Sequence, residues 1–424
     1  MSFLRLKEIL LFLFLLFIPT QLGRHFWPEW SYVLGTRVDY LSPTLYFLDL
    51  IWLFLFLLNW IKPSAPTKVG TSPLTGRSFL SFKVILLALF VVVNVLVASN
   101  KEVCVYRWLR LFQLIWTIFY LNKNKILVKE FLIKIIPIWI IFEGFLSLSQ
   151  MVNGGSLNGL FYFLGERRFS FNTIGIAQMS FFDQLLVRAY GTFSHPNSLA
   201  GFVLVALVWW FNLKPSAPTK VGTSPLTGRL LFWVVVWMGV VILVLSGSRL
   251  IWLLSLVLGV CFLFKKIKDN KIWIKFALMA VALLVVVLAL INTNYPLNNF
   301  IGGFDKNSFN KRWDLNLASF QMIRERTWTG YGLGNFLVQL PNFSNNNYFW
   351  LQPVHNVLLL ILTESGVLGL GILIFALADY FNGKKIDKTI KLILIIILIT
   401  SMWDHYWITL PQNWWLLVVM LGII

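Results

Sequence analysis

The sequence predicts an all-α, polytopic membrane protein of about 11 or 12 transmembrane helices, with a long and partly helical external loop. Of the 424 residues, 58% are hydrophobic and only 12% are charged, whereas charged residues make up roughly a quarter of an ordinary soluble domain. Apolar runs long enough to cross a bilayer, about 17–25 residues each, recur along the whole chain. The runs do not alternate apolar and polar residues as barrel strands would, so we expect every span to be a helix.

Each expected span is an apolar run bounded by polar or charged residues. The first run, 5–23, lacks a small-residue cleavage site and leads directly into more chain, so we interpret it as an uncleaved span rather than a signal peptide. A tight turn at 247–249 separates the runs at 230–246 and 250–264. The remaining expected spans lie at 44–61, 79–98, 103–121, 126–148, 197–213, 272–292, 355–378, 389–402 and 404–424.

The basic residues indicate the orientation of the chain. More than half of the 36 lysines and arginines fall in every second loop, where acids are few, as the positive-inside rule requires of cytoplasmic loops. We therefore expect the N-terminus in the cytoplasm and the segments 20–43, 149–196 and 293–354 on the outer face. The net charge of +19 does not indicate a nucleic-acid partner, because the basic residues are distributed over loops and form no single basic domain.

Two features of the sequence carry no chemistry. The tract KPSAPTKVGTSPLTGR occurs identically at 62–77 and 214–229, each time between two expected spans. A polar tract rich in Pro, Ser, Thr and Gly is typical of a flexible linker, whose lengthening is cheap in a loop. Cys104 and Cys261 both lie in or beside expected spans, so they define neither a disulfide framework nor a metal cluster.

Arginines that persist in the expected outer segments need a reason other than topology. Arg188 precedes the stretch GTFSHPNSLAG, which places His195 and Asn197 directly ahead of an apolar run. Arg249 lies in SGSRLIWL, where small residues would let an anion approach closely. Arg312 falls at the N-terminal end of an expected helix, where the helix dipole also favours anions. The alternative for Arg249 is an interfacial arginine that snorkels to water.

The long outer loop 293–354 is expected to be ordered. The segment NKRWDLNLASFQMIRERTW carries an apolar stripe at helical spacing, formed by Trp313, Leu317, Phe320 and Ile323. The glycines of GYGLGNF permit sharp turns after this helix. As a phosphate-binding signal this segment is weak, because no strand precedes it and no Lys-Ser/Thr follows.

The stretch QPVHNVLLLILTESG returns the chain to the membrane, with His355 and Asn356 at the mouth of the span and Glu364 deeper inside. An imidazole is well matched to proton transfer near neutral pH, and arginines bind phosphate oxygens in bidentate fashion without deprotonating. This combination predicts a site for an anionic, lipid-borne group. Purely structural roles for His355 and for Glu364 are the alternatives. No metal site is expected, because Glu29 and Asp39 form only a weak pair of candidate ligands.

The order of these motifs resembles the O-antigen ligase/polymerase superfamily. The motifs are RAYGTFSHPNSLAGF, SGSRLIWL, KRWDLNLASFQMIRERTWTGYGLGNF and HNVLLLILTESGVLGL, and the resemblance covers roughly residues 185–375. It implies a GT-C-like fold and a metal-independent membrane glycosyltransferase that needs no cofactor. It further implies transfer of a glycan from undecaprenyl diphosphate to an acceptor hydroxyl, at the outer face of the bacterial inner (plasma) membrane. The expected domains are N-terminal transmembrane helices at 1–150 and a ligase-like region at 151–424.

The resemblance also implies roles for single residues. Arg249 and Arg312 would hold the lipid diphosphate and His355 would serve the acceptor hydroxyl, so these three form the expected catalytic set. The expected substrate-binding residues are Arg188, His195, Asn197, Asn356 and Glu364. The implied partners are the lipid-linked glycan, an acceptor glycan or lipid, and the bilayer. A repeat-unit polymerase, an anionic solute transporter and a structural membrane subunit are the competing hypotheses, and the sequence does not identify the acceptor.

Overall fold

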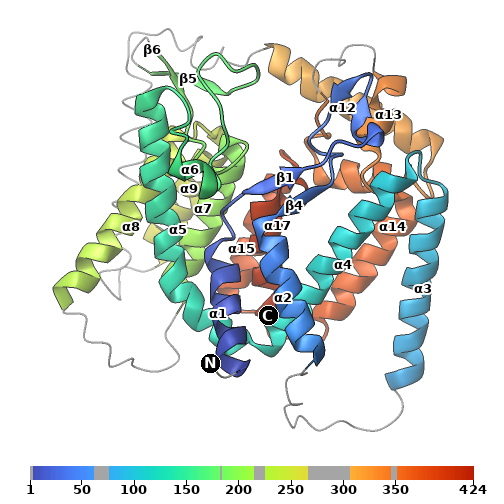
Figure 1. The fold of residues 1–424 in the computed structure, drawn as a ribbon, viewed down its shortest axis with the longest axis horizontal. Coiled ribbons are helices and arrows are strands. Elements are labelled where there is room, and N and C mark those ends of the chain that lie inside the picture. The colour runs from blue at the N-terminus through green and yellow to red at the C-terminus, as the bar shows by residue number, and fades with distance from the viewer. Residues whose placement is uncertain (1–2, 62–75, 182–183, 214–224, 266–305, 345–350) are drawn as a thin grey trace.

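The computed structural model describes residues 3–61, 76–181, 184–213, 225–265, 306–344 and 351–424. This part of the chain is mostly helical. The longer helices run between two ends of the molecule: the N-terminus lies at one end, and the ribbon β5–β6 lies at the other with α12 (Lys306–Glu325) and α13 (Phe336–Phe343) (Figure 1). The segments expected on the outer face of a membrane are thus at the same end.

The long helices overlap the expected spans. In the N-terminal part they are α1 (Phe3–Leu16), α2 (Phe47–Ile61), α3 (Gly76–Leu96), α4 (Lys101–Lys123) and α5 (Lys125–Asn153). In the middle of the chain they are α7 (Pro196–Asn212), α8 (Pro225–Leu245) and α9 (Arg249–Lys265). Towards the C-terminus they are α14 (Val357–Phe381), α15 (Lys388–Ser401) and α17 (Pro411–Gly422). The expected span at 272–292 lies outside the described residues, as do most residues of the duplicated tract.

Polar residues at the helix starts explain where these helices begin. The side chains of Asn100 and Asn356 accept hydrogen bonds from backbone N–H groups in the first turns of α4 and α14. His195 does the same for α7, and Pro196 follows at the first helical position, where its missing N–H costs nothing. Two helices, α5 and α14, are long and apolar enough to cross a bilayer, and several shorter apolar helices accompany them. The number of membrane crossings stays a prediction.

The structure corrects three expected spans, and short strands accompany its mostly helical fold. The helix of the run 5–23 ends at Leu16, and the run 44–61 begins with a strand. Three antiparallel two-stranded ribbons occur in the described chain. The pairs are β1 (Gly23–His25) with β4 (Thr44–Tyr46), β2 (Tyr32–Val33) with β3 (Thr36–Arg37), and β5 (Gln178–Phe181) with β6 (Gln184–Val187). Strands of two to four residues are too short to show the alternating pattern by which a strand is recognised in a sequence.

The third correction concerns the run 404–424. The chain leaves α15 at Ser401, forms the short helix α16 (Tyr406–Thr409), and only then starts α17 at Pro411. Proline lacks an N–H and therefore begins a helix more readily than it continues one. The residues at 402–405 consequently lie in a turn and not in a membrane helix.

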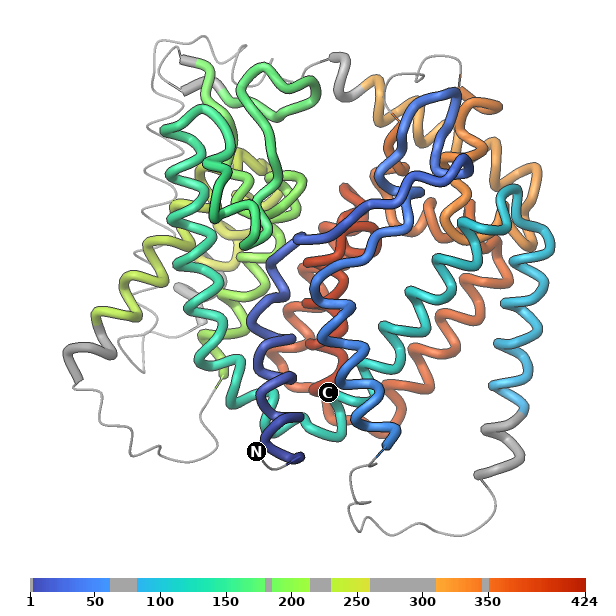
Figure 2. The backbone as a smooth tube through the Cα atoms, viewed as in Figure 1, coloured from blue at the N-terminus to red at the C-terminus, as the bar shows by residue number. Residues whose placement is uncertain are grey.

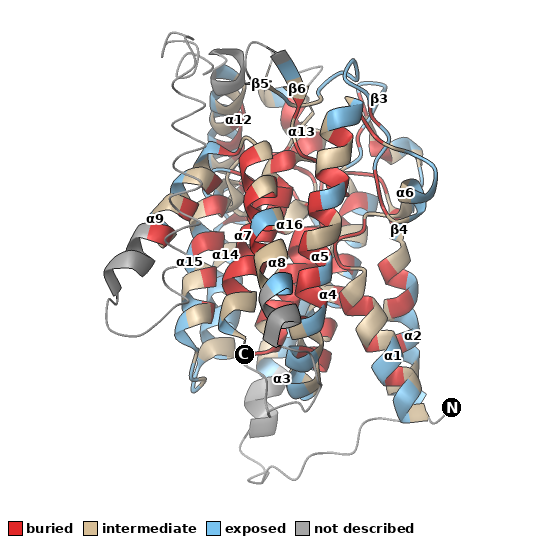
Figure 3. Cartoon of the chain, turned by 90° about the vertical axis from the view of Figure 1, so that its left-hand side faces the viewer, coloured by how far each residue is buried: buried red, intermediate tan, exposed pale blue. Residues whose placement is uncertain are grey.

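Helix α7 is the centre of the bundle. Every residue from Ser198 to Trp209 is buried, and the helix packs against α5, α8, α9, α15 and α17 (Figure 3). Large apolar side chains are exposed on outer helices instead, among them Leu89 of α3 and Phe375 of α14. A helix that is apolar all round is stable only inside a bundle or a membrane. The core thus fixes α7, and with it the polar stretch at its N-terminal end.

Helix α14 is broken where the loop after α12 packs into it. Gly366 has a φ of 64° inside the helix, a conformation that a side chain would strain. The loop after α12 supplies the missing hydrogen bonds: the N–H groups of Tyr331 and Gly332 donate to the carbonyls of Thr363 and Glu364 at 3.0 and 2.9 Å. Non-helical backbone at membrane depth is stable when protein groups satisfy it in this way. The glycines of GYGLGNF and the Gly366 break therefore belong to one packing arrangement.

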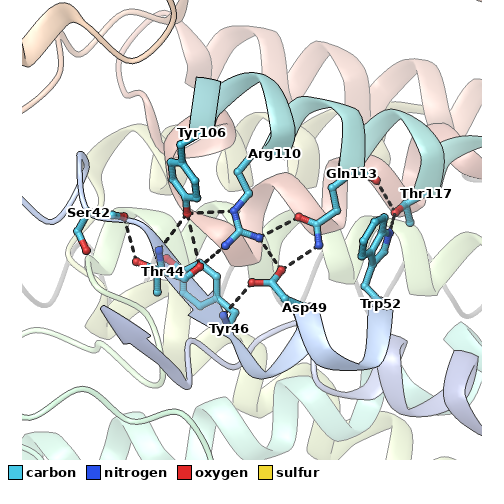
Figure 4. Close-up of polar contacts among 9 residues, drawn as sticks. All are labelled: Ser42, Thr44, Tyr46, Asp49, Trp52, Tyr106, Arg110, Gln113 and Thr117. Carbon is cyan, nitrogen blue, oxygen red and sulfur yellow. Dashed lines mark hydrogen bonds and ion pairs between the residues drawn. The ribbon is translucent and has the colours of Figure 1, made fainter. Parts of the chain in front are cut away.

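A buried ion pair fastens the first ribbon to α4 (Figure 4). Arg110 Nη1 donates to Asp49 Oδ1 at 2.6 Å, and Gln113 Nε2 donates to the same carboxylate oxygen at 2.9 Å. Arg110 Nη2 also donates to the carbonyl of Thr44 in β4, and Tyr106 Oη accepts from the Thr44 N–H at 3.1 Å. These contacts hold the base of the β1–β4 ribbon against the bundle.

Replacing Arg110 by methionine is expected to lower the free energy of unfolding by about 3–5 kcal/mol, because Asp49 would remain buried without its cation. Denaturant-induced unfolding in mixed micelles measures the change. The matched control is Lys101→Met on the same helix, where the lysine is exposed. The double variant Arg110→Met/Asp49→Leu should recover part of the loss. An Arg110→Met protein as stable as the Lys101→Met protein would show that the ion pair contributes nothing.

Candidate functional site

Arg188 ties the segment before α7 to the turn before α9. Its Nη2 donates to Asn197 Oδ1 at 2.8 Å, and its Nε donates to the carbonyl of Ser246. Gly247 makes this approach possible: its φ is 61°, and a Cβ atom there would lie 2.9 Å from Arg188 Nε. The motifs RAYGTFSHPN and SGSR, which are far apart in the sequence, therefore form one structural unit.

The C-terminal turn adds an acid to this unit. Asp404 accepts from Asn197 Nδ2 at 3.1 Å and from the N–H of His405 at 2.8 Å, and only 8% of it is exposed. Asn197 thus bridges a cation and an anion, donating to Asp404 and accepting from Arg188. Figure 2 shows the C-terminal part of the chain, in red, at the centre of the molecule. The polar side chains at the N-terminal end of α7 are therefore hydrogen-bonded to one another.

His355 completes a cluster with Asp404 and His405. One ligand atom from each of the three residues lies within 4.8 Å of the others, and the two imidazole rings are 5.1 Å apart between centroids. Nδ1 of His355 is buried and has no hydrogen-bond partner among the described residues. Asn356 links the same segments, because it caps α14 and donates to the carbonyl of Met402 at 3.3 Å. The Nδ1 atom of His355 is therefore available to accept a proton, close to the carboxylate of Asp404.

Arg312 acts electrostatically on this cluster, and Arg188 and Arg249 act on groups beside it. The charge of Arg312 lowers the pKa of His355, of His195 and of His405, in each case in addition to burial. Burial is also the largest cause that lowers the pKa of Arg188, to about 10, and the charges of Arg249 and Arg312 add to it. Arg188 is thus repelled by both other arginines, and an anion bound beside it would reduce this repulsion.

The histidines are neutral at physiological pH. Burial lowers the pKa of His355 to about 3 and that of His195 to about 4, and the carboxylate of Asp404 opposes both shifts only partly. For Asp404 itself, burial would raise the pKa, but His405, His355, His195 and the hydrogen bond from Asn197 lower it below its usual range. The site thus holds a neutral imidazole next to an ionised acid, which is the state that a proton acceptor requires.

The pH dependence of the reaction should follow this shift. A base with a free-enzyme pKa near 3 stays neutral down to low pH, so we expect kcat/KM to be flat between about pH 8 and pH 5. In Arg312→Ala one of the repelling charges is gone, so the inflection should move to higher pH. The measurement is initial rate against pH in a detergent-stable preparation. A wild-type inflection near 6.5, the ordinary histidine value, would contradict the arrangement.

Two other predicted groups lie elsewhere. Glu364 is half-buried in α14 near the broken turn, accepts from the N–H of Phe336 at 3.4 Å, and lies in the field of Arg107. Its contacts favour the structural alternative over substrate binding. Glu29 and Asp39 are both exposed, in the segment 20–43.

The expected helix with Arg312 is α12. Its apolar stripe is exposed and does not face the core: Trp313 is 55% and Phe320 52% exposed.

Sequence reasoning missed Asp404 and His405. It assigned both to the start of a membrane span, although an ionisable pair inside the apolar run SMWDHYW was a signal of function or of a break in the helix. It also found no metal-ligand cluster, because the three residues of the cluster are brought together from separate segments. Their ligand atoms are close enough to hold a cation, but the neighbouring charge of Arg312 disfavours one.

Comparison with protein families identifies the middle of the chain. Residues 233–374 match the family model described as O-Antigen ligase. The chain carries an O-antigen ligase domain. Arg249, Arg312 and His355 lie within this ligase domain, whereas Arg188, Asn197 and Asp404 lie outside it and join it only in space. Neither the curated proteins nor the solved structures gave a match to the chain. The ligase domain indicates a membrane function of the O-antigen ligase/polymerase kind.

Proposed function

We propose that the protein is an O-antigen ligase-like glycosyltransferase. It transfers a glycan from undecaprenyl diphosphate to an acceptor hydroxyl, at the outer face of the plasma membrane and without a metal ion. The single observation that carries this proposal is that the charge of Arg312 acts both on the buried imidazole of His355 and on Arg188, on which Arg249 also acts. The family match supports the lipid-linked donor.

In this mechanism the arginines hold the leaving group. The acceptor oxygen attacks the anomeric carbon of the glycan, the bond from that carbon to the diphosphate oxygen breaks, and the bonding electrons pass to the diphosphate. Negative charge therefore grows on the leaving group in the transition state. Arg249 and Arg312 stabilise that charge, since preorganised cations in a site with little water act strongly on it.

His355 takes the proton of the acceptor hydroxyl as the new bond forms. The imidazolium that results is stabilised by the carboxylate of Asp404, whose charge favours the protonated form of His355. Asn197 keeps that carboxylate in place while it also holds Arg188, so the cationic and the proton-accepting parts of the site share one support. Burial of these groups maintains their geometry before substrate binds.

The experiment uses the full chain in nanodiscs with an undecaprenyl diphosphate-linked oligosaccharide and a labelled acceptor. A ligase adds one block to each acceptor, whereas a repeat-unit polymerase gives a ladder of lengthening chains. Addition of a chelator should leave the rate unchanged. Uptake of a solute into proteoliposomes without any glycan transfer would favour a transporter and reject the proposal.

A further inference from the structure

The first outer segment, residues 20–46, reaches from the bundle to the candidate site. Its β1–β4 ribbon is anchored at Thr44 by Arg110 and Tyr106 (Figure 4). Figure 1 shows β1 and β4 running from the end of α1 towards α12 and α13. This segment lies outside the ligase domain at 233–374, so the family match does not account for it.

A series of rings joins this segment to His355. The ring of Tyr40 meets that of His405 edge-on, with 5.6 Å between centroids, and His405 in turn lies 5.1 Å from His355. Arg107 holds the backbone of Tyr40 by donating to its carbonyl. A molecule that lies on the first outer segment at Tyr40 is therefore one ring away from the proposed proton acceptor.

Exposed arginines and aromatic rings alternate on the outer side of Tyr40. The guanidinium of Arg37 lies 5.4 Å from the ring centre of Trp27, and the imidazole of His25 stacks on the same ring at 5.6 Å. Arg24 lies over Phe26 at 5.8 Å. Basic residues are disfavoured in outer loops by the insertion machinery, so their presence here needs a function.

A second outer segment contributes two more arginines to the same region. Arg167 and Arg168 are exposed, and Arg168 lies 4.7 Å from the ring centre of Tyr162. Burial is the main cause that lowers the pKa of His25, Asp39 opposes it, and the charge of Arg167 lowers it further. Arg167 acts on Tyr40 as well, together with Arg107. Arg24, Trp27, Arg37, Arg167 and Arg168 are called the outer arginine surface below.

Arg312 and Arg167 act on different groups. Arg312 affects His195, His355, His405 and Arg188 at the mouths of the central helices. Arg167 instead affects His25, Tyr40 and Tyr190. His405 and His355 thus lie between two basic regions, one with Arg312 and one with Arg167. The proposed function assigns the region of Arg312 to the donor diphosphate. The region of Arg167 is therefore the candidate site for the second substrate, the acceptor.

We propose that the outer arginine surface binds the acceptor, and that the acceptor is a glycan carrying carboxylate or phosphate groups. Guanidinium groups bind these anions in bidentate fashion, and the half-buried ring of Trp27 helps to hold the guanidinium of Arg37 in place. Glu29 and Asp39 are also exposed here, so the four arginines outnumber the acids. That this glycan is the acceptor rests on the proposed function. That the surface binds an acidic glycan rests only on its arginines.

The test is a binding titration that does not need catalysis. The full chain in phosphatidylcholine nanodiscs is titrated with fluorescent oligogalacturonate and with its carboxyl-reduced, uncharged form. We expect the acidic probe to bind more tightly, and the double variant Arg37→Gln/Arg167→Gln to weaken its binding about tenfold while leaving the uncharged probe unaffected. The matched control is Arg324→Gln, an exposed arginine on α12, which should change neither affinity.

Two outcomes overturn this inference. Equal affinity of wild-type protein for both probes would show that the surface does not recognise charge. If the double variant instead loses affinity only for nanodiscs or vesicles rich in phosphatidylglycerol, the arginines bind the membrane surface and not a glycan. Transfer assays then separate the two proposals: a protein that binds the acidic probe but transfers no glycan disproves the proposed function and leaves the binding surface intact.

Discussion

His355→Ala should lower the rate of glycan transfer by about 10²–10⁴-fold, because the variant has no group that can accept the proton of the attacking hydroxyl. The imidazole is neutral in the folded protein, and its Nδ1 has no hydrogen-bond partner in the described chain, so its removal leaves no partner of Nδ1 unsatisfied there. The fold should therefore survive the change. Transfer is measured in nanodiscs under saturating donor, and stability by thermal unfolding of the same preparation.

The control for this variant is Gln352→Ala, three residues away in the same segment and only partly buried. It should retain transfer close to the wild-type rate. The loss in His355→Ala should appear mainly in kcat, since the imidazole acts on the proton in the transition state and adds little to ground-state binding. A His355→Ala protein that is fully folded and still transfers at more than a tenth of the wild-type rate would reject the role of this residue.

Arg312→Ala should reduce transfer by about 10²–10³-fold, because the charge that develops on the leaving diphosphate loses one of its preorganised partners. Arg312→Lys should recover only part of this loss, since an ammonium group cannot bind two phosphate oxygens in the geometry of a guanidinium. Arg312 lies near the start of α12 and is partly exposed, so the substitution leaves the core of the helix unchanged.

The matched control for Arg312 is Arg324→Ala at the other end of α12, where the arginine is exposed. Both substitutions remove one positive charge from the same helix, but only Arg312 affects the pKa of His355. Equal rates in the two variants would mean that net charge at the outer face, and not the position of Arg312, controls transfer. An unchanged affinity for undecaprenyl diphosphate in Arg312→Ala would argue against diphosphate binding by this residue.

Much of the helical architecture is predictable because apolar patterning is a local property. A run such as 197–213 must avoid water whatever surrounds it, and it forms the central helix α7. The helix starts at Asn100, His195 and Asn356 follow from side-chain capping, which depends on a few neighbouring residues. The short ribbons and the helix break at Gly366 were not predicted, since both are stabilised by partners distant in the sequence.

The candidate site was likewise predictable only in part from the sequence. The sequence alone places Arg188, Arg249, Arg312 and His355 at helix mouths on one side, because positive residues there depart from the positive-inside rule. Only the tertiary structure joins Asn197 to Asp404 across 207 residues, and only it assigns Glu364 to the broken turn of α14. The physical reason is that hydrophobicity selects where a segment lies from its own composition, whereas the partner of a buried polar group depends on which helices pack around α7.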